Sequence, residues 1–198
     1  MVNDEQIRRD VIVLGASAGG VEALTVLFAN FAQDLPAVIG CVLHRSPTFN
    51  VQLAWVLGRR STLKIVEPAN GDPLKSNIIH LAPSDHHMLF HPGQVEVSRG
   101  PQEHFTRPAI DPLFRSAAAA FGERVVGVLL TGAGDDGVTG LVQIKAAGGL
   151  VLVQDPEEAK VPSMPQSAVT HDHVDLVLPL ASIADALLQL ARGNAIAA

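Results

Sequence analysis

Residues 11–20 read VIVLGASAGG, an apolar run of strand length that ends in a turn of small residues. A helix pattern follows directly, because Leu24, Leu27 and Phe28 are spaced to share one apolar face. A strand that passes through a tight turn into a helix is the building unit of an α/β sheet. The turn also carries Ser17, whose hydroxyl is expected to point out of the sheet beside free backbone amides.

Strand-length apolar runs and helix patterns alternate through most of the chain, which indicates a parallel sheet covered by helices. Besides the elements above, strands are predicted at residues 37–43, 63–66, 125–130, 150–153 and 174–178. Helices are predicted at about 46–58, 111–122, 136–147 and 183–191. Prolines at positions 156, 162 and 165 indicate an irregular stretch before the last strand.

The middle of the chain has a different pattern. Short strand-like runs at residues 78–82, 86–90 and 94–98 are separated by Pro-Ser-Asp and His-Pro-Gly turns. We therefore predict an α/β fold with a doubly wound, mostly parallel sheet, helices on both faces, and an antiparallel hairpin excursion around residues 78–98. A single domain is expected over residues 11–194, after an N-terminal tail of residues 1–10.

The composition restricts the class of protein. Hydrophobic residues make up 47% of the chain and charged residues 17%, as in a packed globular protein. The net charge of −6 argues against a nucleic-acid partner, which would need a basic surface. No secretion signal and no apolar run of roughly 20 residues is present, so we expect a cytoplasmic protein without membrane insertion. The one cysteine, Cys41, lies in an apolar run and is expected to be a buried thiol.

Three polar residues of different chemistry follow three of the predicted strands. Ser17 follows the first strand, His44 follows the second, and Asp136 lies in the turn after residues 125–130. The carboxyl ends of parallel strands gather at one edge of a sheet, where the three side chains can meet. An imidazole can take the proton of a serine, and a carboxylate can orient the imidazole. The pattern predicts Ser17 as nucleophile, His44 as general base and Asp136 as the orienting acid.

Backbone amides near Ser17 are candidates for an oxyanion hole. The N–H of Ala18 begins the first helix, and that of Ala133 lies in a glycine-rich turn. Taken singly, each residue of the trio also has a structural interpretation. Small residues around Ser17 can serve close packing, His44 can be an ordinary core or cap histidine, and Asp136 can cap a helix. Their joint placement at three strand ends favours catalysis.

Several other motifs fit poorly. A dinucleotide fingerprint would need a glycine where Ser17 stands, and a P-loop would need Gly-Lys-Ser/Thr, which is absent. Residues 15–19 match the Gly-x-Ser-x-Gly elbow of α/β-hydrolases literally. That fold, however, has the order serine, acid, histidine along the chain, whereas here the histidine precedes the acid.

The histidines are candidate metal ligands. They group at positions 80, 86, 87 and 91, and again at 171 and 173. His87 and His91 have the spacing of a helical zinc pair, but they fall in a predicted hairpin and lack the glutamate of that motif. A hard cation at Asp135 and Asp136 is likewise less favoured than a turn with one outward acid. No metal is therefore expected.

Taken together, these segments resemble the catalytic domain of CheB-type chemotaxis protein-glutamate methylesterases. The resemblance is carried by Ile12–Gly20, by His44, and by three further motifs. These motifs are LAPSDHH at 81–87, RPAIDPLF at 107–114 and LTGAGDDG at 130–137. It extends to the Met164-Pro165 segment and so covers nearly the whole chain.

The resemblance implies hydrolysis of glutamate methyl esters, and deamidation of glutamines, on the cytoplasmic helices of methyl-accepting chemoreceptors. It assigns the same roles to Ser17, His44 and Asp136, and implies no cofactor. Members commonly have a Thr at position 18, a Met at position 133 and a Gln at position 43, where this chain has Ala18, Ala133 and Leu43. They also carry a receiver domain ahead of the catalytic domain. Here only about ten residues precede the first strand, so we expect either a shortened piece of such a protein or a free-standing enzyme, on which a receiver domain or kinase would act only in trans, if at all.

Two other functions remain open at this point. A non-catalytic chemosensory signalling module could keep the fold and bind a receptor or kinase without turnover. A small-molecule esterase or a nucleotide-binding protein could use the same turn at Ser17.

Overall fold

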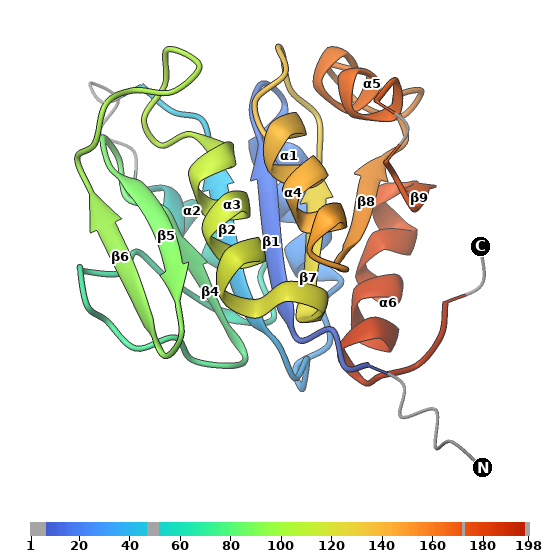
Figure 1. The fold of residues 1–198 in the computed structure, drawn as a ribbon, viewed down its shortest axis with the longest axis horizontal. Helices are drawn as coiled ribbons and strands as arrows, with labels where there is room; N and C mark the ends of the chain where they lie inside the picture. The colour runs from blue at the N-terminus through green and yellow to red at the C-terminus, as the bar shows by residue number, and fades with distance from the viewer. Residues whose placement is uncertain (1–6, 47–51, 172, 197–198) are drawn as a thin grey trace.

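A seven-stranded parallel sheet forms the centre of the computed structural model, which describes residues 7–46, 52–171 and 173–196 (Figure 1). The strand order is β3-β4-β2-β1-β7-β8-β9, and every neighbouring pair is parallel. The strands are β1 (Val11–Ala16), β2 (Val38–Leu43), β3 (Lys64–Val66), β4 (Ile78–Leu81), β7 (Val125–Leu129), β8 (Leu150–Gln154) and β9 (Leu176–Leu178). The predicted α/β fold is confirmed.

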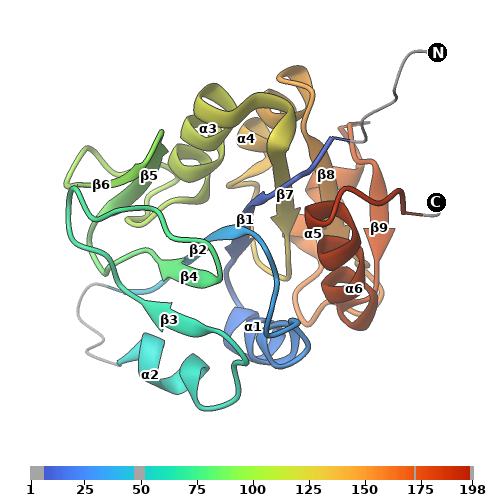
Figure 2. The ribbon, with the colours of Figure 1, turned by 90° about the horizontal axis from the view of Figure 1, so that it is seen from below.

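Helices cover both faces of the sheet (Figure 2). The first layer contains α1 (Gly20–Ala29), α2 (Leu53–Gly58) and α6 (Leu180–Ala191), and the second contains α3 (Ile110–Phe121), α4 (Val138–Ala146) and α5 (Ser163–Val169). Strand β1 shows why two layers form. Ile12 and Leu14 belong to the first apolar cluster, whereas Val11 and Val13 belong to the second. Alternate side chains of a central strand point to opposite faces, so an unbroken apolar run needs cover on both.

A separate antiparallel hairpin, β5 (His87–His91) and β6 (Gln94–Ser98), packs on the α3 side of the sheet (Figure 1). Its Phe90 ring lies directly over Gly40 of β2, where an added Cβ would be 2.6 Å from the ring. The predicted excursion around 78–98 is thus shorter than expected. Residues 78–81 form β4, which pairs in parallel with β2 and belongs to the main sheet. The turn at 83–86 follows β4 and leads out of the sheet into the hairpin.

Two helix predictions need correction. The stretch expected to be irregular contains α5, because Pro165 is the third residue of that helix, where the N–H of a helix has no intrahelical partner. Helix α2 begins at Leu53 rather than near Ser46. The predicted start at Pro47 lies outside the described residues.

The chain changes direction across the sheet at β1. From β1 it passes to β2, β3 and β4 on one side, and it then returns to β7 on the other side of β1. Loops leave in opposite directions at such a switch point, and the crevice between them at the carboxyl edge is where open α/β sheets bind ligands. Among the described residues, no helix is both long enough and apolar enough to cross a bilayer.

Candidate active site

The three predicted residues meet at the carboxyl edge of the sheet. Ser17 directly follows β1, His44 directly follows β2, and Asp136 lies in the turn after β7. His44 Nδ1 is 3.1 Å from Ser17 Oγ, and His44 Nε2 is 2.7 Å from Asp136 Oδ2. Because β2 and β7 flank β1, residues that are 27 and 92 positions apart in the chain form one continuous hydrogen-bonded chain.

The backbone fixes the ends of the three strands relative to one another. The amide of His44 donates to the carbonyl of Ala16, and the amide of Ser17 donates to the carbonyl of Thr131. The first bond lies one residue beyond the last pair of β1 and β2, and the second lies two residues beyond the last pair of β1 and β7. The hydroxyl and the imidazole are therefore held by the same hydrogen bonds that hold the sheet.

The Asp136 carboxylate is held by the beginning of helix α3. Only 2% of the residue is exposed, and its oxygens accept hydrogen bonds from the amides of Ile110 (2.7 Å) and Asp111 (3.1 Å). Burial alone would raise the pKa of Asp136. The hydrogen bonds from His44 and the two amides outweigh burial and lower the pKa below its ordinary value. The acid is therefore ionised at neutral pH, as an orienting carboxylate must be.

Asp136 does not cap its own helix, since Gly137, with φ of 96°, stands at the start of α4. Instead, helices α3 and α4 exchange caps. Asp136, just before α4, binds the first amides of α3, and Asp111, in the first turn of α3, accepts a 2.7 Å hydrogen bond from Gly140 of α4. Each carboxylate thus lies at the positive end of the other helix, where negative charge is stabilised.

The two predicted oxyanion donors lie in exposed turns beside Ser17. Ala18 immediately precedes the start of α1, and Ala133 follows Gly132, where an added Cβ would be 2.8 Å from the Ser17 Cβ. Neither amide donates to an acceptor within the part of the chain that the structure describes. Both are free to donate to a bound group. Their role as an oxyanion hole stays a prediction.

Sequence reasoning missed two buried polar residues that shape this edge. Thr131 Oγ1 donates to the carbonyl of Ala18 (3.0 Å) and accepts from the amide of Val161 (2.8 Å), so it ties the serine turn to the segment before α5. The side chain of Gln154, at the end of β8, accepts from the Thr131 amide at 2.8 Å. The signal in the sequence was a polar residue at the carboxyl end of each strand, the same signal that identified Ser17 and His44.

A pocket of about 300 Å³ opens beside His44. Its lining residues are His44, Arg45, Ser46, Gln102, Phe105, Thr106 and Arg107. Arg45 contacts Glu67 at 2.9 Å, and Arg107 contacts Asp85 at 2.6 Å, so both guanidiniums are held in place at the pocket wall. Phe105 is 99% exposed, which is unusual for an aromatic side chain and leaves its whole ring available at the rim.

The grouped histidines have partners within the protein. His80 and His87 are buried and bond to backbone atoms, at Ile39 and at Pro101 respectively, while His91 pairs with Glu96 at 2.8 Å. His87 and His91 lie on strand β5, so their spacing of four is not that of a helical zinc pair.

Comparison with known proteins places the chain in a family. The family description "CheB methylesterase" matches residues 12–187. A protein-glutamate methylesterase/protein-glutamine glutaminase 2 of Anaeromyxobacter dehalogenans is 42% identical over 185 residues, which is 93% of this chain and 54% of that protein. The chain thus spans about half the length of this relative.

Two further relatives are matched along nearly their whole length. A putative protein-glutamate methylesterase/protein-glutamine glutaminase of Leptospira interrogans is 34% identical over 93% of this chain and 96% of its own. The crystal structure of the Thermotoga maritima CheB methylesterase catalytic domain superposes with a TM-score of 0.86 at 32% identity, covering 91% of this chain and 98% of that one. The resemblance predicted from sequence is confirmed, and the chain belongs to the CheB methylesterase family.

Proposed function

We propose that this protein is a protein-glutamate methylesterase that also deamidates glutamine, acting on the cytoplasmic helices of methyl-accepting chemoreceptors. The observation that carries the proposal is the unbroken contact from Ser17 through His44 to the buried Asp136. Family membership supports the substrate class, because the relatives named above are methylesterases and glutaminases. The proposal places the protein in the cytoplasm, with no cofactor.

In the proposed reaction each residue of the trio has a step. Ser17 Oγ attacks the ester carbonyl while its proton passes to His44 Nδ1, and Asp136 stabilises the imidazolium. The amides of Ala18 and Ala133 would bind the oxyanion of the tetrahedral intermediate. His44 then gives its proton to the leaving methoxide, which departs as methanol and leaves an acyl-serine. Water, deprotonated by His44, hydrolyses this ester to the glutamate carboxylate and free Ser17. For glutamine the leaving group is ammonia.

Methanol release from methylated receptor fragments tests the proposal. Ser17→Ala should lower turnover by about 10⁴-fold or more, because it removes the atom that forms the covalent intermediate. Ser182→Ala is a matched control, since Ser182 is an exposed serine of α6. Normal turnover by Ser17→Ala would disprove the assignment. Receptor binding without methanol release by the wild-type protein would instead favour a non-catalytic signalling module.

A further inference from the structure

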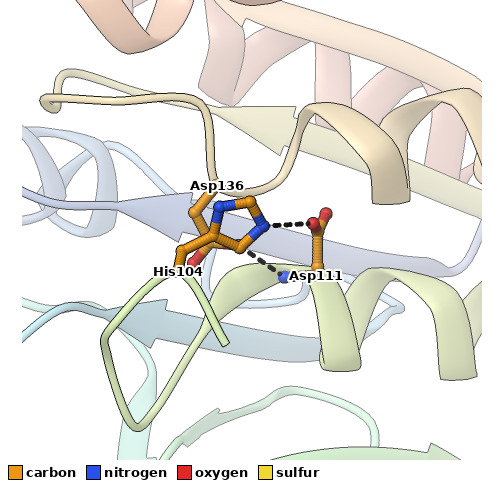
Figure 3. A group of neighbouring side chains, drawn as sticks. All are labelled: His104, Asp111 and Asp136. Atoms are coloured by element: carbon orange, nitrogen blue, oxygen red, sulfur yellow. Dashed lines mark hydrogen bonds and ion pairs between the residues drawn. The ribbon is translucent and has the colours of Figure 1, made fainter. Parts of the chain in front are cut away.

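His104, which sequence reasoning did not single out, lies over the two exchanged helix caps (Figure 3). Its Nε2 is 3.0 Å from Asp111 Oδ2 and 3.8 Å from Asp136 Oδ1, while its Nδ1 is 3.3 Å from Asp135 Oδ1. The backbone places the ring there at a cost. His104 and Phe105 are consecutive left-handed residues with φ of 49° and 60°, a conformation that costs free energy for side chains other than glycine.

The two buried aspartates present an electrostatic problem. Asp111 and Asp136 are each 2% exposed. One ring nitrogen of His104 and one carboxylate oxygen of each aspartate all lie within 4.8 Å of one another. Two carboxylates this close resist being ionised together, and burial makes the repulsion stronger. Burial is the first cause that raises the pKa of Asp111, and the charge of Asp136 adds to it. A nearby positive charge would relieve the conflict.

The other charged groups around the cluster are already paired or peripheral. Arg115 of α3 contacts both oxygens of Glu103 at 2.8 Å, so these two charges largely cancel. Asp135 is 70% exposed, and His87 of β5 is bonded to the carbonyl of Pro101. Arg115 also acts on both carboxylates, but its charge does not change with pH in this range. Of the described residues, His104 is the histidine whose ring lies within 4 Å of both Asp111 and Asp136.

We infer that His104 is a positioning residue of the triad, acting through Asp136 and not touching the substrate. Its imidazolium offsets the charge of Asp111, so that Asp136 and Asp111 together present a single net negative charge to His44. The inference rests on the proposed function. In this role, His104 determines the pH below which the reaction loses activity.

The pKa of His104 agrees with this geometry. Burial lowers it, but the carboxylates of Asp136, Asp111 and Asp135 outweigh burial and raise it above its ordinary value. The ring therefore keeps its charge to a higher pH than an ordinary histidine. Removing this charge leaves Asp136 and Asp111 without a counter-charge wherever Asp111 is ionised, and the added negative charge beside His44 favours the protonated form of His44. Since protonated His44 cannot accept the Ser17 proton, activity should be lost at a higher pH on the acid side.

The test is the pH profile of kcat/KM for methanol release. The variant His104→Gln keeps a hydrogen-bond donor toward Asp111 but lacks the positive charge of the imidazolium. The acid limb of its profile, the low-pH side on which kcat/KM falls, should move up by about half to one pH unit. That corresponds to about three- to ten-fold lower activity well below the midpoint of the acid limb and to little change on the alkaline plateau. Adding Asp111→Asn removes the surplus negative charge while keeping an oxygen for the Gly140 amide. The double variant should return the limb to within about 0.2 pH unit of the wild type.

A purely structural role for His104 predicts the opposite for the double variant, which would then be the most impaired. His91→Gln is the control, because that half-exposed histidine pairs with Glu96 on the hairpin, away from the triad. The inference would be overturned if the acid limb of His104→Gln coincided with that of the wild type. It would also be overturned if the acid limb of the double variant were shifted as far as that of His104→Gln.

An NMR titration of the His44 ring in the Ser17→Ala background separates this inference from the proposed function, because it needs no turnover. With His104→Gln the ring should hold its proton to a higher pH, and with the double substitution it should not. That result would stand even if wild-type protein released no methanol. Identical titration curves for all three proteins would refute the coupling.

Discussion

His44 presents its two ring nitrogens in a definite order, with Nε2 toward the acid and Nδ1 toward the serine. In the chymotrypsin arrangement the nitrogens have exchanged roles, with Nδ1 toward the aspartate. The chemistry is the same, because a neutral imidazole needs only one N–H for the carboxylate and one lone pair for the hydroxyl. Here the buried Asp136 selects the Nε2–H tautomer, which leaves the Nδ1 lone pair for the Ser17 proton.

We expect a substitution at Phe105 to weaken substrate binding while leaving the rate of the chemical step unchanged. Its exposed ring lies at the rim of the pocket beside His44 and can cover the apolar stem of a glutamyl ester. Phe105→Ala should raise KM about three- to ten-fold with kcat nearly unchanged, since it removes binding shared by substrate and transition state. Val177→Ala, a partly exposed position on β9, should leave KM unchanged. A fall in kcat at constant KM would contradict this role.

Among the elements, helices α3 and α4 are the pair that supports the acid. They approach closely enough that a Cβ on Gly140 would be 2.4 Å from the Phe114 Cβ and 3.0 Å from Asp111 Oδ1. This close crossing lets the amide of Gly140 reach the Asp111 carboxylate at 2.7 Å. The absence of a side chain at position 140 therefore keeps the exchanged caps within hydrogen-bonding distance.

Gly140→Ala should reduce the free energy of unfolding by about 1–3 kcal/mol, because the added methyl overpacks the crossing of the two helices. Urea denaturation measures this. Gly58→Ala is the matched control, since Gly58 ends helix α2 and a Cβ there would meet no atom of the described residues within 4 Å. That control should be neutral or stabilising by up to about 1 kcal/mol, as expected from helix propensity alone. Equal stability of the two variants would show that the crossing can relax.

At the scale of the whole molecule, the central strands are inaccessible unless the sheet opens. Cys41 lies in β2 between β1 and β4 and is fully buried, as its apolar surroundings in the sequence predicted. Burial strongly raises the pKa of its thiol, although the charge of Arg45 acts in the opposite direction. Both inaccessibility and protonation protect a thiol, because the thiolate is the reactive form.

Labelling of Cys41 by a thiol reagent should therefore report global unfolding. In native buffer the reaction should be slower than that of a free cysteine by a factor near the folding equilibrium constant, about 10³ or more. It should accelerate with urea along the unfolding curve followed by circular dichroism. Fast labelling without denaturant would reveal local opening of β2, next to His44.

The sequence predicted those features that depend on periodicity and on strand ends. Ser17 and His44 were found because each is the first polar residue after a buried strand, and parallel strands bring such residues together. The assignment of residues 78–81 to the hairpin was wrong because nothing local shows that they pair with residues 38–41. The contacts of His104 and Asp111 were not predicted for the same reason, since they join separate loops and helices. The catalytic roles remain predictions.

The exchanged caps affect how an inactive form of this protein should be prepared. Asp136→Ala would remove the hydrogen-bond acceptor for the first amides of α3 as well as the partner of His44. Loss of activity in that variant could therefore not be attributed to the missing charge alone, because the start of α3 would also lose its hydrogen bonds. Ser17→Ala takes away one hydroxyl oxygen and leaves every backbone contact at the sheet edge intact. It is the substitution suited to trapping the proposed substrate, a methylated receptor helix, on the protein for crystallography.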